Sequence, residues 1–196
     1  MGEIIKFENS LEVYFTRTGI AYHYKSHSGK INYFPAEHYV YFSLIVLSAK
    51  EKDLERAKEI INRYDGIASM REIILVGNAN QQIQEIKTNK PIKFIEHRKK
   101  QTPIITSVKE ALSCISNFST FAVVCPASKE CTEKSELESI LKNAKGKEFE
   151  FIVPKAGEKR LHPVIIGKNG FAKIKSVRKE QGFKYISKNF FTEVGI

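Results

Sequence analysis

Tryptophan is absent from this sequence, methionine occurs twice, and no apolar run is long enough to cross a lipid bilayer. The longest apolar run, Tyr39 to Leu47, falls far short of the roughly 20 residues that a membrane-spanning helix needs, and it is predicted to be a buried strand. The first residues, Met-Gly-Glu-Ile-Ile-Lys, lack the basic and apolar segments of a secretion signal. We therefore expect a cytoplasmic protein that does not associate with membranes.

Cysteine is also scarce, with three residues and no Cys-x-x-Cys pair, which excludes the usual structural zinc sites and favours reduced thiols. Cys125 ends an apolar run and is expected to pack in the core, whereas Cys131 is expected to be exposed. His23, His27 and His38 could together form a metal site. They have no cysteine or acidic partner at a fixed spacing, which favours surface histidines, so no metal site is predicted.

Acidic residues are outnumbered, with 22 Asp and Glu against 32 Lys and Arg, and the formal net charge is +10. A basic protein attracts polyanions and phosphorylated ligands without specificity. The basic residues are scattered in short clusters, and no aromatic-interleaved RNA motif or Gly-x-x-Gly loop accompanies them. A nucleic-acid partner is therefore an alternative that depends on charge alone.

The first forty residues are rich in Tyr, Phe, Thr and Val and carry turn signals at Thr18-Gly19 and Ser28-Gly29. This pattern predicts short strands at 11–17, 20–25 and 30–34. We expect residues 1–39 to form a β-rich extension that packs on a main domain of residues 40–196.

After residue 40 apolar runs alternate with segments of helical periodicity. Such alternation predicts a three-layer α/β domain with a mixed, mainly parallel sheet, and any ligand is expected at the carboxyl ends of the strands. The predicted strands are 40–47, 72–77, 92–96, 121–125, 149–153 and 163–166. Helices are predicted after the capping pairs Ser48 with Glu51 and Ser107 with Glu110, after Thr132, and at 78–87 and 170–180.

The segment His162-Pro163-Val164-Ile165-Ile166-Gly167, with Gly182 before Tyr185, resembles the end of the molybdenum-cofactor nucleotidyltransferase-like family. Further collinear matches extend the resemblance over about residues 40 to 186. They are Ile73 to Gly77 for the second strand, Ser107-Val108 with Ala111-Leu112 for a Ser-Leu, Gly-Leu helix, Ala122 to Ala127 for the central strand, and Phe151 to Pro154 for the strand that follows.

The resemblance implies transfer of a nucleoside monophosphate from a nucleoside triphosphate, with Mg²⁺ held by a carboxylate. In that family a Gly-rich loop after the first strand wraps the triphosphate. Here Ser48-Ala49-Lys50 leads directly into a predicted helix, so the loop is absent, and Lys50 or Lys52 is left as a contact for phosphate. The family's metal-binding Asp is replaced by Ser128, and a hydroxyl cannot supply the anionic ligand that a hard cation prefers.

We therefore expect a divergent nucleotidyltransferase-like protein that binds a nucleotide or phosphorylated small molecule, or regulates a partner, without Mg²⁺-dependent transfer. One alternative is an active NTP-dependent nucleotidyltransferase that uses Glu130 and His162 in an unusual site, with Mg²⁺. Another is a basic nucleic-acid-associated protein. The oligomeric state and the cofactor stay open. The expected ligand-binding residues are Ser48, Lys50, Ser107, Ser128, Lys129, Lys155 and Arg160, and the expected catalytic residues are His162 and Glu130.

Overall fold

The computed structural model falls into two units, Met1–Val40 and Tyr41–Ile196, which are described separately. In the first unit only the secondary structure of its strands is described. In the second unit the described residues are 41–50, 53–77, 85–97, 102–116, 119–144, 149–178, 182, 185–186 and 191–195.

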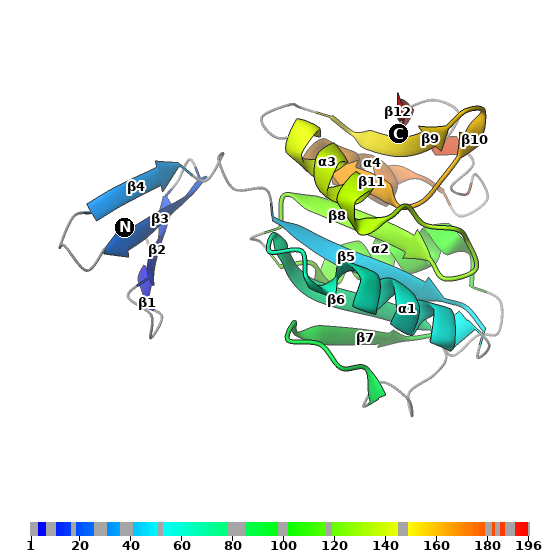
Figure 1. Ribbon diagram of the computed structural model, residues 1–196, viewed down its shortest axis with the longest axis horizontal. Helices are drawn as coiled ribbons and strands as arrows, with labels where there is room; N and C mark the ends of the chain where they lie inside the picture. Colours follow the sequence, from blue (N-terminus) through cyan, green and yellow to red (C-terminus); the bar gives the residue numbers. More distant parts are fainter. Residues whose placement is uncertain are drawn as a thin grey trace. The chain divides into compact units, whose positions relative to one another are not determined.

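The N-terminal unit contains a four-stranded antiparallel sheet in the order β1-β2-β3-β4 (Figure 1). Strands β2 (Leu11–Thr16), β3 (Gly19–Lys25) and β4 (Ile31–Pro35) lie within two residues of the predicted positions. The short first strand β1 (Ile4–Lys6) was not predicted from the sequence. The histidines considered for a metal site belong to this unit, and their side chains lie outside the described residues.

The main unit is built on one mixed sheet in which β10-β9-β11-β8-β5-β6-β7 are successive neighbours and β12 also pairs with β9. Four strands, β8, β5, β6 and β7, run parallel, and β11 is antiparallel to both β8 and β9. The mainly parallel, mixed sheet predicted from the sequence is thus confirmed. The strands are β5 (Phe42–Ser48), β6 (Met70–Gly77), β7 (Ile92–Glu96), β8 (Phe121–Pro126), β9 (Phe151–Ala156), β10 (Lys159–Arg160), β11 (Val164–Gly167) and β12 (Phe191–Gly195).

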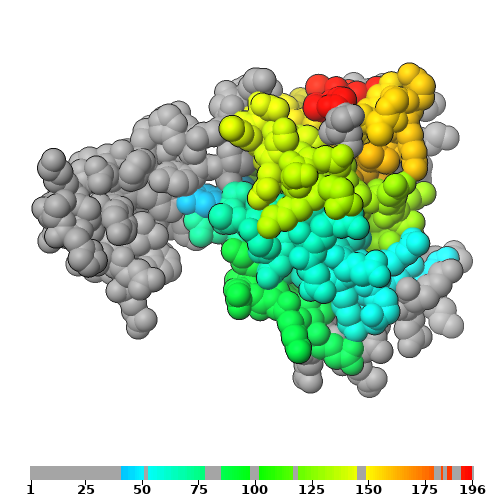
Figure 2. All heavy atoms as spheres, viewed as in Figure 1, coloured from blue at the N-terminus to red at the C-terminus, as the bar shows by residue number. Residues whose placement is uncertain are grey.

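Helices cover both faces of this sheet and complete the three layers (Figure 1). Helices α1 (Leu54–Asp65) and α3 (Lys134–Ala144) lie side by side on one face, where Figure 2 shows them in cyan and yellow-green. Helices α2 (Ile104–Cys114) and α4 (Lys168–Ser176) cover the other face. Among the described residues, no helix combines the length and the apolar character needed to span a bilayer.

The core explains why the apolar runs of the sequence locate the central strands. All seven residues of β5 are buried, because helices cover both of its faces. Alternate residues such as Ile45 and Leu47 face α2, whose buried side chains include Val108 and Leu112. Cys125 of β8 is fully buried, as predicted.

Three predicted helix starts are wrong, because residues other than the expected Ser and Thr begin these helices. Ser48 is the last residue of β5, and α1 begins only at Leu54. Ser107 lies inside α2, which begins at Ile104 after Pro103. Thr132 precedes the start of α3 by two residues, and Glu133 N–H instead donates to the Glu136 carboxylate at 2.7 Å.

Two further predictions differ from the structure. The basic helix predicted at 170–180 is α4, which begins and ends earlier. Strand β12, which was not predicted, pairs in parallel with β9. Most of the helix predicted at 78–87 lies outside the described residues, and Ile86 and Lys87 are not helical.

Candidate functional site

A cleft opens where the parallel strands β5 and β8 end. The two strand ends are joined by a hydrogen bond of 2.9 Å from Ala127 N–H to Leu47 O. The carboxyl ends of parallel strands are the usual place for ligands in such sheets. The cleft has a volume of about 410 Å³, within the range of small-molecule sites. It is called the β5–β8 cleft here, and it is lined by Ala49, Lys50, Asp53, Arg56 and Ser128.

One wall of the β5–β8 cleft is a turn closed by two reciprocal hydrogen bonds. Lys50 N–H donates to Asp53 Oδ2 at 3.1 Å, and Asp53 N–H donates to Lys50 O at 2.9 Å. The Asp53 residue is only 6% exposed. Ser48 lies buried below the turn, where its hydroxyl donates to Lys50 O at 3.5 Å. The carboxylate of Asp53 therefore takes up a backbone amide that would otherwise be available to an anion.

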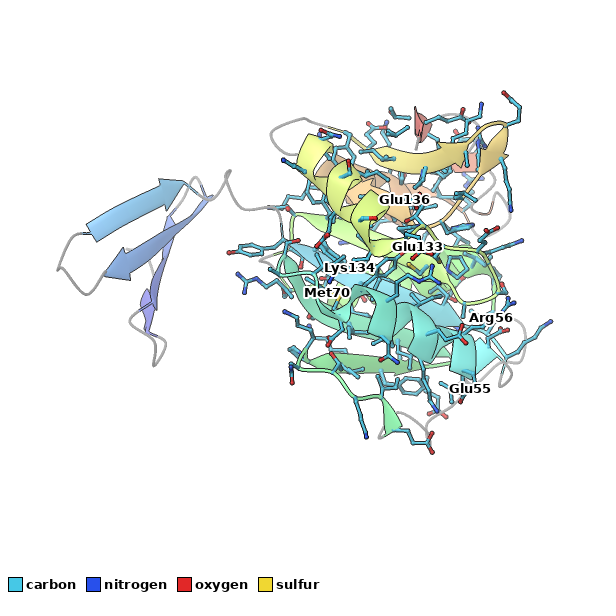
Figure 3. The ribbon with its side chains drawn as sticks, in the orientation of Figure 1. Glu55, Arg56, Met70, Glu133, Lys134 and Glu136 are labelled. Atoms are coloured by element: carbon cyan, nitrogen blue, oxygen red, sulfur yellow. The ribbon has the colours of Figure 1, made fainter. Side chains whose placement is uncertain are left out.

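Two cations and a hydroxyl face solvent at the cleft. Lys50, Arg56 and Ser128 are exposed. Figure 3 places Arg56 at the start of α1, beside the carboxyl end of β5. Within the part of the chain that the structure describes, no ion pair involves either cation. The sequence predictions for Lys50 and Ser128 thus fall in one cleft.

The segment after Ser128 forms a separate ionic contact. The Glu130 carboxylate pairs with Lys159 of β10 at 2.5 Å, and this partner lowers the pKa of Glu130. Both side chains are about two-thirds exposed. Glu130 is thus paired with Lys159 and is not among the residues that line the β5–β8 cleft.

His162 lies against the same segment through its backbone. Its N–H donates to Glu130 O at 3.2 Å, and its carbonyl accepts from Thr132 N–H at 2.6 Å. Burial, reinforced by the charge of Lys129, lowers the pKa of His162 to about 4. The imidazole is therefore neutral at physiological pH, and its Nδ1 atom is buried without a hydrogen-bond partner among the described residues.

The other basic candidates lie at the far edge of the sheet. Glu193 of β12 accepts Arg160 Nε at 2.6 Å and pairs with Lys155 at 3.3 Å. Lys155 also approaches Glu158 at 3.4 Å. These residues link β9, β10 and β12, and neither Lys155 nor Arg160 is among the residues that line the β5–β8 cleft.

Ser107 belongs to a third cluster, next to the end of β7. Its hydroxyl lies 3.4 Å from His97 Nδ1, and His97 Nε2 lies 2.6 Å from a carboxylate oxygen of Glu110. His97 N–H in turn donates to Gly77 O at 3.0 Å. The cluster is therefore at the carboxyl-end edge of the sheet, but it does not line the β5–β8 cleft.

The donor set of the cleft does not suit a metal ion. Among the described residues that line the cleft, Asp53 alone is a carboxylate, and one of its oxygens already accepts a backbone N–H. Among the described residues there is no group of three or more His, Cys, Asp or Glu side chains that could hold a metal. Cys131, expected to be exposed, is instead buried, and a hydrogen bond with Cys125 lowers its pKa.

The sequence analysis did not identify two charged residues of the cleft, Asp53 and Arg56. A signal for Asp53 was present in its spacing from Lys50, because an acidic side chain three residues after a turn residue can reach back to that residue's amide. Arg56 follows three residues later on the same helix face, where it looks like an ordinary solvated side chain.

The fold of this chain is similar to that of several solved structures. No protein-family model and no curated protein sequence matches this chain. The crystal structure of Rv0371c from Mycobacterium tuberculosis H37Rv has a TM-score of 0.60 at 14% identity, over 81% of this chain and 89% of that one. The same Rv0371c protein was also solved in complex with manganese.

Two further solved structures share this fold. The 4-diphosphocytidyl-2C-methyl-D-erythritol synthase of Anaerococcus prevotii has a TM-score of 0.57 at 14% identity, over 80% of this chain and 87% of that one. A protein of Desulfovibrio desulfuricans named as a nucleotide-diphospho-sugar transferase has a TM-score of 0.51 at 5% identity, over 79% of each chain. The chain therefore has a nucleotidyltransferase-like α/β fold.

Proposed function

We propose that this protein binds a nucleotide or another phosphorylated small molecule in the β5–β8 cleft and does not carry out metal-dependent nucleotidyl transfer. The observation that carries the proposal is the lining of the cleft, in which Lys50 and Arg56 face solvent beside the hydroxyl of Ser128. Positive side chains and a hydroxyl are the groups that phosphate oxygens accept hydrogen bonds from. In this reading the protein acts as a sensor or regulatory subunit.

The loss of transfer is supported by the positions of the candidate catalytic residues. Glu130 is paired with Lys159, and His162 is partly buried beside Lys129. Neither lines the cleft with Lys50. In the proposal the residues of the cleft bind and orient a phosphate, and those that the structure describes supply no carboxylate pair for a metal ion.

Two alternative functions are supported by fewer observations. Assignment to the molybdenum-cofactor branch, as an active transferase with Glu130 and His162, depends on the sequence resemblance alone. Attraction of nucleic acid depends on the net charge of +10. It requires an affinity that falls steeply as salt concentration rises, and an affinity that is independent of salt would rule it out.

A thermal-shift panel of nucleoside mono- and triphosphates, each with and without Mg²⁺, tests the proposed function. A ligand that binds only the folded state raises the melting temperature by mass action. We expect a rise with at least one phosphorylated compound and no release of pyrophosphate from any triphosphate. Pyrophosphate release that depends on Mg²⁺ would contradict the proposal in favour of an active transferase, and no rise with any compound would contradict ligand binding.

A further inference from the structure

We infer that Lys50 and Arg56 neutralise the charge of the ligand in place of a metal ion, so that the β5–β8 cleft binds a phosphate monoester dianion without any divalent cation. The inference deepens the proposed function and depends on it. It names the ligand class and the protein groups that neutralise its charge.

The oxygen ligands of the cleft do not suit a divalent cation. Hard cations such as Mg²⁺ require several oxygen ligands, usually with one or two carboxylates. The cleft supplies the carboxylate of Asp53, which is held in its turn by Lys50 N–H at 3.1 Å, and the neutral hydroxyl of Ser128. The first carboxylate after Ser128, that of Glu130, is paired with Lys159. Two side-chain cations in the same cleft would also repel a divalent ion.

Lys50 and Arg56, by contrast, suit a single phosphate group. Lys50 comes from the turn after β5 and Arg56 from the first turn of α1, so both border the same cleft. Arginine offers a planar fork that can bind two phosphate oxygens, whereas lysine acts as a point charge. The hydroxyl of Ser128, on the β8 side of the cleft, can donate to a phosphate oxygen.

The charges of the cleft favour a phosphate monoester over a triphosphate. A phosphate monoester has a second pKa of about 6, so it carries nearly two negative charges at neutral pH. Lys50 and Arg56 supply one positive charge for each of those two, and with the Asp53 carboxylate the described lining carries a net charge of +1. A metal-free triphosphate would bring further negative charge close to the Asp53 carboxylate, and like charges at short range repel. Asp53 is therefore a specificity-determining residue of this cleft.

Binding of inorganic phosphate to the full chain, followed by ³¹P NMR at a pH above 7, tests the inference. We expect the same affinity, within about twofold, in EDTA and in excess Mg²⁺. We expect Arg56→Gln and Lys50→Gln each to weaken binding by about tenfold, the usual effect of losing one charge-assisted hydrogen bond. Lys142→Gln removes one exposed positive charge from α3, away from the cleft, and should change the affinity by less than about twofold.

Asp53→Asn provides a second test that preserves the turn. The amide oxygen of Asn can still accept Lys50 N–H, while the negative charge is removed. We expect this variant to bind ATP in EDTA several-fold more tightly than the unchanged protein, because the repulsion is gone. An unchanged or weaker ATP affinity would contradict the role assigned to Asp53.

The outcomes separate this inference from the proposed function. Phosphate or nucleotide binding that disappears in EDTA would overturn the inference and leave the proposed function standing. Equal losses in the Arg56, Lys50 and Lys142 variants would also overturn it, since they would indicate a general charge effect. No binding of phosphate or of any nucleotide, with or without Mg²⁺, would overturn both.

Discussion

At the residue scale, Glu72 is a charged side chain buried near the start of β6. Burial would raise the pKa of this carboxyl, but hydrogen bonds from Lys93, the Ser116 N–H and Ser43 together lower it. Lys93 lies 2.6 Å from one carboxylate oxygen, and the Ser116 N–H and Ser43 hydroxyl each lie 2.7 Å from the other. The charge is thus fully partnered across three segments of the chain.

We predict that Glu72→Gln lowers the free energy of unfolding by about 2–3 kcal/mol, because Lys93 and Ser116 lose an anionic acceptor. Urea unfolding at neutral pH measures the change. Glu59→Gln, at an exposed position of α1, is the matched control and should shift stability by less than about 0.5 kcal/mol. Equal stability of the two variants would show that the Glu72 network contributes nothing.

His162 gives a pH dependence whose sign follows from its lowered pKa. The folded pKa is about 4, whereas the unfolded value is about 6.5. Between those values the unfolded chain binds a proton that the folded chain does not, so stability falls as the pH falls. We predict that His162→Gln reduces the loss of stability between pH 7 and pH 4 by roughly 2–3 kcal/mol, measured by urea unfolding. An NMR titration that gives His162 an ordinary pKa would contradict this account.

At the scale of elements, the close approach of β5 and β6 depends on Gly77. A Cβ atom at this position would collide with the backbone carbonyl oxygen of Ser48. Ser48 is the last residue of β5 and leads into the turn of the β5–β8 cleft. The end of β6 therefore controls the position of one wall of the cleft.

We predict that Gly77→Ala destabilises the protein by about 1–3 kcal/mol, the usual cost of forcing extra atoms into a packed region. It should also weaken phosphate binding, because the turn after β5 must move. Gly195→Ala in β12 is the control, since no atom lies near the Cβ that it adds. Wild-type stability and affinity in Gly77→Ala would refute the proposed coupling of strand packing to the cleft.

The positions of the central strands could be predicted from the sequence, whereas the helix starts could not. Continuous apolar runs located β5 and β8, because strands covered on both faces contain little else. Helix starts were misplaced, because the turn before α1 is closed by the Asp53 carboxylate and α2 follows Pro103. The prediction placed Ser and Thr at the helix caps, and it therefore missed the Asp53 turn and Pro103.

The candidate site was also only partly predictable from the sequence. Lys50 and Ser128 were predicted from the resemblance to the nucleotidyltransferase-like family, and both line the cleft. Arg56 was missed because a charged residue on a helix usually faces only water. The partners of Glu130, Lys155 and Arg160 could not be predicted, because β10 and β12 bring them together only in the folded sheet.

At the scale of the whole molecule, the described core belongs to the main unit. A cluster of buried apolar residues draws on β5, β6, β8, β9, β11, α2 and α4, all within Tyr41–Ile196. A unit with its own core can fold alone. The packing of the N-terminal unit on the main unit stays a prediction.

We predict that a fragment of residues 41–196 folds cooperatively and binds inorganic phosphate as the full chain does, within about twofold. Near-UV circular dichroism and the ³¹P measurement give the two readouts. Full-length protein is the reference for both. A fragment without fixed tertiary structure would contradict the independence of the main unit.

The most direct test of the central claim is a ¹H–¹⁵N NMR titration of the full chain with inorganic phosphate in EDTA. The account predicts that the amide signals of Ala49, Lys50 and Ser128 shift together with a single binding curve, and that added Mg²⁺ leaves the curve unchanged. Amide shifts that are confined to other parts of the chain, or that begin only when Mg²⁺ is added, would contradict it.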